Sequence, residues 1–454
     1  MRNADRGTPS AETIAAIATP PGRGGVAIVR ASGPQASGIA RALVGRVPAP
    51  RLASYATARD ASGRPIDQGL CLYFAGPASF TGEDVVEFHG HGGPASTGAV
   101  LQAFLAAGAR LARPGEFTER AFLNDKIDLA QAEAVADLIE AQSAEAARLA
   151  MRSLSGEFSQ TVHSVVRQIT ELRALVEAML DFPEEEVDRL HAEDALDRLV
   201  RVRAALQGLI KSSHAGRAYR EGLRVAIIGL PNVGKSSLLN RLAGQDRAIV
   251  TALPGTTRDV LRESLVVSGV PITVADTAGL RDTEDVIERE GIARTKQEAA
   301  EADAVLLVLD ASDVNAAHEA GPALSRAIGA LNGRPILRAF NKVDLVPTGS
   351  ARRSGNDLWL SARTGAGIKL LEEALVELAG VRSAEGSAFL ARERHLRAME
   401  LADQEFMAAA AASSRWELLA EHLRLAQEHL GSITGEVTAD DLLGEIFSRF
   451  CIGK

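Results

Sequence analysis

The stretch Gly229-Leu230-Pro231-Asn232-Val233-Gly234-Lys235-Ser236-Ser237 decides the fold of this chain. It has the GxxxxGK[ST] spacing of a phosphate loop, in which backbone N–H groups surround a β-phosphate, the lysine contacts the β and γ oxygens, and the serine hydroxyl ligates Mg²⁺. The apolar run Leu223–Ile228 before it predicts a buried strand, and residues 237–242 continue with helix formers. A strand and a helix on either side of the motif predict a nucleotide-binding α/β domain.

Three further motifs indicate GTP rather than ATP. Asn341-Lys342-Val343-Asp344 follows the apolar run 335–340, and an aspartate there accepts both the N1–H and the N2–H of guanine, whereas adenine has neither donor in that arrangement. Ser361-Ala362-Arg363 follows a short predicted strand, where a backbone N–H contacts the guanine carbonyl oxygen. Asp276-Thr277-Ala278-Gly279 provides an aspartate for the outer sphere of Mg²⁺ and a glycine N–H near the γ-phosphate. Along the chain the motifs follow in the order GxxxxGKS, DxxG, NKxD and SA, at spacings that fit alternating strands and helices. This combination predicts a GTPase.

The position after Gly279 predicts an unusual route to hydrolysis. Ras-type GTPases have a glutamine there to orient the attacking water, and this chain has Leu280. Oxygens from Asn232 and from the stretch 251–259 suit a monovalent cation, with Thr251 and Thr256 near the cation and Thr257 on Mg²⁺, so we expect hydrolysis stimulated by K⁺. The alternative for Asn232 is a turn residue without a ligand role.

Glu288 lies in an acidic stretch that follows the switch motif. A carboxylate there can orient the attacking water in place of the missing glutamine, and the alternative is a solvated acidic loop. The residues expected to contact GTP are Asn232, Val233, Gly234, Lys235, Ser236, Ser237, Thr251, Ala252, Leu253, Pro254, Gly255, Thr256, Thr257, Asp276, Thr277, Ala278, Gly279, Asn341, Lys342, Val343, Asp344, Ser361, Ala362 and Arg363.

Composition fits a multidomain globular enzyme. The chain has 454 residues, of which 46% are hydrophobic and 24% charged, and a net charge of −9 that argues against broad coating of nucleic acid. No apolar run approaches the roughly 18 residues needed to cross a bilayer, and two cysteines are too few for a disulfide framework or a zinc site. We therefore expect a cytoplasmic protein.

Pattern changes along the chain predict a multidomain fold with three kinds of domain. Residues 1–123 combine strand patterns at 25–30, 69–74 and 84–89 with a helix at 99–107, which predicts an α+β domain. Residues 124–220 and 381–454 are helical, and residues 221–380 form the P-loop domain. One α-helical domain interrupted by an inserted Ras-like α/β domain is the economical interpretation, with two separate helical domains as the alternative.

Two smaller signals concern chemistry outside the P-loop domain. Only seven of the 50 basic residues are lysines, so Lys126 and Lys454 suggest sites where a compact ammonium is wanted. His89 and His91 form a pair in a glycine-rich stretch, which more often makes hydrogen bonds in a turn than binds a metal.

Taken together, the motifs resemble the bacterial tRNA-modification GTPase family MnmE, also called TrmE, over essentially the whole chain. The resemblance is carried by the GTPase motifs, by Gly255-Thr256-Thr257-Arg258-Asp259 and by six further segments. These segments are PPGRGGVAIVR (20–30), FTGED (80–84) with HGHGG (89–93), RPGEFT (113–118) running into FLNDK (122–126), and FCIGK (450–454).

The resemblance implies an activity and its partners. The family acts with the flavoprotein MnmG to place a carboxymethylaminomethyl or aminomethyl group on C5 of the wobble uridine (U34) of certain tRNAs. It uses GTP hydrolysis and a tetrahydrofolate one-carbon unit, and FAD is present only through MnmG. The N-terminal domain binds 5-formyltetrahydrofolate and makes a homodimer.

Carried onto matching positions, the resemblance implies specific sites. Folate contacts correspond to Arg30, Glu87, Lys126 and Lys454; K⁺ ligands to Asn232, Thr251, Leu253 through its carbonyl and Thr256; Mg²⁺ ligands to Ser236 and Thr257; and the catalytic carboxylate to Glu288.

Three alternatives stay open. Cys451 is either a nucleophile near the folate or a small buried residue of a C-terminal helix. The rivals for function are a stand-alone regulatory GTPase, for example in ribosome assembly, and a folate-dependent aminomethyltransferase, against which the GTPase insertion argues.

Overall fold

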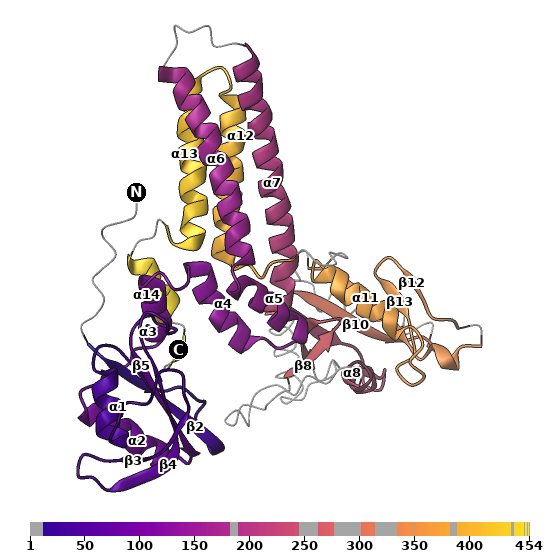
Figure 1. The fold of residues 1–454 in the computed structure, drawn as a ribbon. Coiled ribbons are helices and arrows are strands. Elements are labelled where there is room, and N and C mark those ends of the chain that lie inside the picture. Colours follow the sequence, from indigo (N-terminus) through magenta and orange to yellow (C-terminus); the bar gives the residue numbers. More distant parts are fainter. Residues whose placement is uncertain are drawn as a thin grey trace. The chain divides into compact units, whose positions relative to one another are not determined.

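The computed structural model describes residues 12–181, 189–244, 262–276, 301–313, 334–347, 349–381, 388–436, 440–448, 450–451 and 453. The chain divides into two compact units, one formed by residues 1–136 and 427–454 and the other by residues 137–426. Figure 1 labels most of their helices and several of their strands. The domain boundaries predicted from the sequence (1–123, 124–220, 221–380 and 381–454) are not tested by this division and stay a prediction.

A six-stranded sheet forms the body of the first unit, in the order β3-β4-β5-β2-β1-β6. Its neighbouring strands run antiparallel, except for the parallel pair β1 and β6. The strands predicted at 25–30 and 69–74 fall within β2 and β4, and the strand predicted at 84–89 overlaps β5 from Val85 onwards, so all three are confirmed. The strand bounds are β1 (Ile14–Ile17), β2 (Gly24–Ser32), β3 (Ser54–Arg59), β4 (Pro65–Phe74), β5 (Val85–Gly92) and β6 (Arg110–Leu111).

Helices α1 (Ala36–Val44) and α2 (Pro94–Ala106) share one core with this sheet, in which Phe88 and Phe104 are fully buried. Helix α2 contains most of the predicted helix but begins five residues earlier, because Pro94 suits a first helical turn. A second cluster joins Phe117 of α3 (Glu116–Leu123) to β1. The C-terminal helix α14 (Asp440–Ser448) packs in the same unit, with the rings of Phe122 and Phe447 6.3 Å apart.

Long helices dominate the first part of the second unit. Figure 1 shows α6, α7 and α12 side by side, and α7 contacts both of the others. The helical stretch predicted at 124–220 is divided by the N-cap Ser143, whose hydroxyl accepts from the Ala146 N–H at 3.1 Å, and by Gly156 at φ +91°. The helix bounds are α4 (Leu129–Glu140), α5 (Ala144–Leu154), α6 (Glu157–Asp181), α7 (Arg189–Glu221), α12 (Glu393–Ala411) and α13 (Trp416–Thr434).

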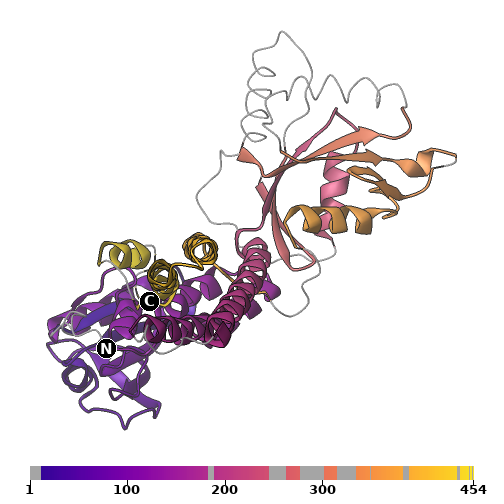
Figure 2. The same cartoon turned by 90° about the horizontal axis from the view of Figure 1, so that it is seen from above.

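The α/β domain inserted between α7 and α12 has a seven-stranded sheet in the order β12-β13-β11-β10-β7-β9-β8. The five inner strands run parallel, and the edge strands β12 and β8 run antiparallel to their neighbours. Figure 2 shows the sheet with α8 in pink and α11 in orange. The element bounds are β7 (Leu223–Ile228), α8 (Lys235–Ala243), β8 (Arg262–Val267), β9 (Val270–Asp276), β10 (Ala304–Asp310), β11 (Ile336–Asn341), β12 (Arg352–Ser354), β13 (Asp357–Trp359) and α11 (Ile368–Leu378).

One face of this sheet buries the main core of the inserted domain. Leu238 and Leu242 of α8 and Leu371 of α11 pack there against Ile227 and Val308. The unbroken apolar runs of β7 and β10 are typical of parallel strands buried on both faces. This architecture confirms the predicted combination of an α+β domain, helices and an inserted α/β P-loop domain.

The segment that re-enters the helical part packs directly on α7. The Phe389 N–H donates to the Ser212 carbonyl at 3.3 Å, and the Phe389 ring lies 5.5 Å from the ring of Phe158 on α6. A Cβ on Gly216 would lie 1.8 Å from the Phe389 carbonyl oxygen, so only glycine permits this contact. Gly208, two turns earlier on α7, has open space around it.

These two glycines give a stability prediction. Gly216→Ala should destabilise the helical part by about 1–3 kcal/mol or more, because backbone has to move to remove the overlap. Gly208→Ala is the matched control and should stabilise by about 0.5–1 kcal/mol, since alanine favours a helix interior. Calorimetry of both variants measures the difference, and equal melting temperatures would contradict the packing described.

Candidate functional site

The phosphate loop connects β7 to α8 at the carboxyl end of the sheet, where parallel α/β folds bind ligands. Gly234 at φ +96° is the N-cap of α8, and Asn232 also has a positive φ of +65°. The Lys235 ammonium donates to the carbonyls of Gly229 at 2.8 Å and Leu230 at 3.1 Å. Ser236 is exposed at the start of the helix. The loop therefore places an ammonium and a hydroxyl beside a helix N-terminus, which suits a phosphate and its cation.

Asn341 connects the phosphate loop to the loops expected to recognise the base. Its side chain is buried, its Nδ2 donates to the Val233 carbonyl at 2.8 Å, and its Oδ1 accepts from the Ala362 N–H at 2.9 Å. Gly234 allows this approach, because a Cβ there would lie 2.4 Å from the Asn341 amide nitrogen. One side chain at the end of β11 thus fixes two loops more than 100 residues apart in sequence.

Asp344 lies in the short 3-10 helix Val343–Leu345 that follows β11. Its Oδ1 accepts from the Ser361 hydroxyl at 2.5 Å, and its Oδ2 accepts from the Arg363 guanidinium. The hydrogen bond from Ser361, together with the Arg363 charge, lowers the pKa of Asp344. The carboxylate is therefore ionised at neutral pH and acts only as an acceptor.

Two residues that the sequence did not single out support these loops. Arg241 of α8 donates from Nε to the Ala362 carbonyl at 3.0 Å and from Nη2 to the Arg363 carbonyl at 2.5 Å. Asp310, the last residue of β10, pairs with the Lys342 ammonium at 2.6 Å. Asp310 could have been found from the sequence, because it is an acidic residue directly at the end of a buried strand. Nothing in the local sequence indicates the partners of Arg241.

The remaining predicted GTP residues divide into two groups. Asp276 ends β9 and is paired in register with Ile227 of β7, so its backbone lies at the same edge of the sheet as the phosphate loop. The other group lies outside the described residues and stays a prediction. It consists of Thr251, Ala252, Leu253, Pro254, Gly255, Thr256, Thr257, Thr277, Ala278 and Gly279, and the predicted catalytic carboxylate Glu288 also lies outside the described residues.

In the N-terminal unit, two of the residues matched to folate contacts form an ion pair. Arg30 and Glu87 face each other on β2 and β5, with Arg30 Nε 2.6 Å from Glu87 Oε1. His89 Nε2 lies 2.8 Å from Glu87 Oε2. Burial raises the pKa of Glu87, but the Arg30 charge and the His89 contact outweigh burial and lower it. The carboxylate therefore stays ionised although its side chain is only 11% exposed.

The other residues matched to the folate site lie on different segments. The Lys126 ammonium donates to the Pro77 carbonyl at 2.9 Å. Cys451 is exposed, and its carbonyl accepts from the Gly115 N–H at 3.4 Å. Lys454 lies outside the described residues, but Gly453 before it packs so closely on β1 that a Cβ would lie 2.4 Å from the Ile17 carbonyl oxygen.

The histidine pair shows no metal-binding arrangement. His89 contacts Glu87, whereas His91 Nδ1 lies 2.7 Å from Asp67, which also accepts from the Ser96 hydroxyl. No group of three possible metal ligands occurs among the residues that the structure describes. Both histidines make the predicted hydrogen bonds, but they lie on β5 and not in a turn.

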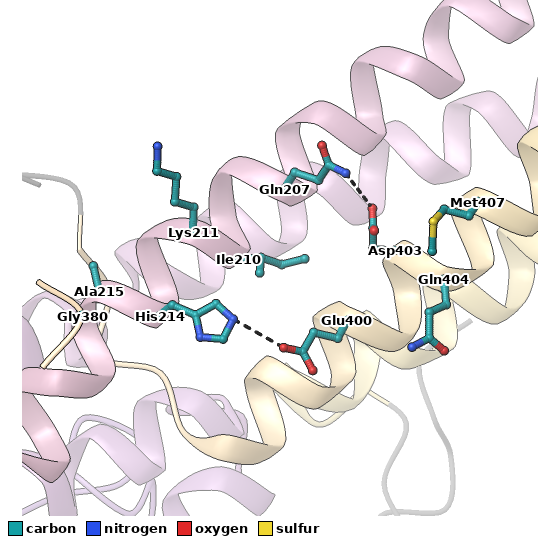
Figure 3. A pocket seen from close by; sticks show the side chains of 10 residues that line it. All are labelled: Gln207, Ile210, Lys211, His214, Ala215, Gly380, Glu400, Asp403, Gln404 and Met407. Atoms are coloured by element: carbon teal, nitrogen blue, oxygen red, sulfur yellow. Dashed lines mark hydrogen bonds and ion pairs between the residues drawn. The ribbon is translucent and has the colours of Figure 1, made fainter. Parts of the chain in front are cut away.

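A separate hollow of about 670 Å³ lies in the helical part, between α7 and α12. Figure 3 shows His214 directed towards Glu400, at 3.4 Å, and Gln207 towards Asp403. Gly380, just after α11, also lines the hollow. It is distinct from the phosphate loop, and no predicted site residue lies in it.

The phosphate loop after β7 and the NKxD and SA loops, joined by Asn341, define a P-loop GTPase domain inserted in a helical domain. Two family models match the chain: "MnmE helical domain" over residues 129–451, a range that includes the inserted domain, and "GTP-binding protein TrmE N-terminus" over residues 13–126. The chain belongs to the MnmE family.

Individual relatives agree with this assignment. A protein of Thiobacillus denitrificans named tRNA modification GTPase MnmE is 52% identical over 98% of this chain and 99% of its own. Its namesake in an Azoarcus species is 54% identical over 98% of both. Among solved structures, a variant of Aquifex aeolicus Era bound to GDP·AlF4⁻ is 25% identical over 41% of this chain and 67% of its own, with a TM-score of 0.28. The assignment therefore rests on the sequence matches.

No helix in the described part of the chain has both the length and the apolar character needed to cross a bilayer.

The bridging role of Asn341 can be tested by truncation. Asn341→Ala leaves the Val233 carbonyl and the Ala362 N–H buried without partners, at a cost of about 1–3 kcal/mol each. We expect a lower melting temperature for the GTPase domain and weaker binding of GDP, measured by calorimetry and titration. Asn240→Ala, at an exposed position of α8, is the control. Identical behaviour of the two variants would disprove the bridge.

Proposed function

We propose that this chain is a K⁺-stimulated GTPase that acts with the flavoprotein MnmG on certain tRNAs. The reaction adds a carboxymethylaminomethyl or aminomethyl group to C5 of the wobble uridine U34, with a tetrahydrofolate one-carbon unit as donor and FAD present only through MnmG. The protein works in the cytoplasm as a homodimer. The observation that carries the proposal is the near full-length match to relatives named tRNA modification GTPases, in a chain that also holds a guanine-nucleotide constellation.

The geometry of the described loops supports the proposed GTP site. Lys235 and the N-terminus of α8 suit the β and γ phosphates, and the exposed Ser236 hydroxyl suits Mg²⁺ together with Thr257. Asp344 suits the N1–H and N2–H of guanine because it is ionised. Asp276, at the end of the neighbouring strand, suits the outer sphere of Mg²⁺.

Hydrolysis is assigned to a cation and a carboxylate. Asn232 is an exposed amide in the phosphate loop, held in a left-handed conformation that directs the chain around the phosphates. Its side-chain oxygen, with Thr251, the Leu253 carbonyl and Thr256, suits K⁺, which supplies positive charge against the charge that develops on the phosphates. Glu288 orients the attacking water in place of the glutamine that Leu280 replaces.

The folate site is assigned to the N-terminal domain. Glu87 is ionised and mostly buried, so it suits the paired N–H donors of a pterin edge. Arg30 beside it, with Lys126 and Lys454, suits the negative glutamate tail or the formyl oxygen. Cys451 belongs to the tail segment that packs on β1 of the same unit, which supports a role for its thiol near the one-carbon unit.

The cation proposal predicts a salt-specific rate. GTP turnover at matched ionic strength should be faster in KCl than in NaCl, because Na⁺ is too small for the same set of oxygens. Asn232→Ala should lower the rate in KCl to near that in NaCl, while Glu288→Ala should slow hydrolysis much more than GTP binding. Phosphate release and nucleotide titration measure these effects. Equal turnover of the wild type in both salts would exclude K⁺ stimulation.

The folate proposal predicts a separable defect. Glu87→Gln removes a charge-assisted acceptor, so 5-formyltetrahydrofolate should bind about tenfold or more weakly. Cells that depend on this variant should lose modification of U34, measured by mass spectrometry of tRNA nucleosides. Asp67→Asn is the matched control, because Asp67 also pairs with a histidine on the same sheet. Full modification with Glu87→Gln, or an unchanged nucleoside in cells lacking the protein, would refute the proposal.

A further inference from the structure

Both carboxylate oxygens of Asp344 are engaged by side chains of one neighbouring loop. Ser361 donates to Oδ1, and the Arg363 guanidinium donates to Oδ2. The Asp344 side chain is 13% exposed, whereas that of Arg363 is 72% exposed. The carboxylate is therefore fixed on one side by a buried serine and on the other by a cation that lies largely in solvent.

Guanidinium and guanine present the same kind of hydrogen-bonding edge. A guanidinium offers N–H donors in a planar fork, and guanine offers N1–H and N2–H side by side in one plane. Both suit a carboxylate. Oδ1 and Oδ2 each already accept one hydrogen bond, so one lone pair on each oxygen is left for guanine. A guanine that binds Asp344 has to displace the Arg363 guanidinium or share Oδ2 with it.

The backbone of this loop is anchored, although the Arg363 side chain is not. Arg241 donates to the carbonyls of Ala362 and Arg363, and the Ala362 N–H donates to Asn341. The Arg363 guanidinium can therefore leave Asp344 by side-chain rotation alone. An exposed ion pair of this kind changes an equilibrium constant by at most about fivefold, so a base can displace it.

We propose that Arg363 is a competitor for the guanine site: its guanidinium occupies Asp344, and guanine nucleotides bind by displacing it. The proposal rests on the assignment of Asp344 to guanine made above. It makes Arg363 a residue that sets nucleotide affinity through its side chain, in addition to any contact of its backbone.

The test uses Arg363→Met in the full chain, because methionine keeps the unbranched stem and removes the guanidinium. Binding of a fluorescent GDP analogue should show a faster association rate and about two- to fivefold tighter equilibrium binding than in the wild type. The difference should shrink at high salt, which weakens the exposed ion pair in the wild type. Arg353→Met is the matched control, since it breaks a similar pair with Glu377 in the same domain, and should change neither quantity.

A second arm identifies the acceptor. Asp344→Asn should shift preference from GDP to xanthosine diphosphate, because an amide N–H matches the carbonyl that xanthine carries at C2. In that background Arg363→Met should have no effect on xanthosine diphosphate binding, since a neutral amide does not hold the guanidinium.

The possible failures are distinct. Unchanged or weaker GDP binding by Arg363→Met, or an effect that persists with Asn at position 344, would overturn the competition while the guanine assignment stands. Undiminished GDP binding by Asp344→Asn would remove the assignment of Asp344 and the competition with it.

Discussion

The buried carboxylate of Asp137 fixes the two points at which the chain leaves and re-enters the helical part. Its side chain is 4% exposed and accepts from Arg220 Nε at 3.0 Å, at the end of α7, and from Arg392 Nη2 at 2.8 Å, just before α12. A carboxylate at this depth is stable only with such partners. Arg217 and Glu393 form a further pair between the same helices at 2.9 Å. An inserted domain needs its two ends close together, and these contacts meet that need without involving the nucleotide loops.

Inside the inserted domain, the parallel sheet brings the predicted nucleotide-binding loops together. Strands β7, β9 and β11 end at one edge, so residues distant in sequence reach one region without long loops. Asn341 then joins the phosphate and base loops, and Arg241 of α8 holds the base loop from the side of the phosphate-binding helix. Arg241 therefore links the helix that follows the phosphate loop to the loop of Ala362 and Arg363.

Local patterns predicted most of this architecture. The phosphate loop, the strand Leu223–Ile228 and three of the six strands of the N-terminal sheet (β2, β4 and β5) were predictable because each depends on neighbours in sequence. The break between α4 and α5 was not, since Ser143, the N-cap of α5, also donates to the distant Gly269 carbonyl at 2.6 Å. The partners of Asp344 and the role of Arg241 also depend on contacts between distant segments. NKxD indicates that an aspartate is available, but not that Arg363 pairs with it.

The last residues of the chain show the same dependence on long-range packing. The C-terminal segment follows α14 and packs in the N-terminal unit, where Gly115 at φ +68° lies so close to the Phe447 carbonyl that a Cβ would be 2.5 Å from its oxygen. Gly453 meets β1 at Ile17, and β1 pairs with β2, the strand that carries Arg30. Any site that combines Arg30 with the C-terminal residues therefore forms only when the C-terminal segment packs on β1. This packing requires glycine at 115 and 453. A side chain at position 115 would push the backbone away from Phe447, and one at position 453 would push it away from Ile17.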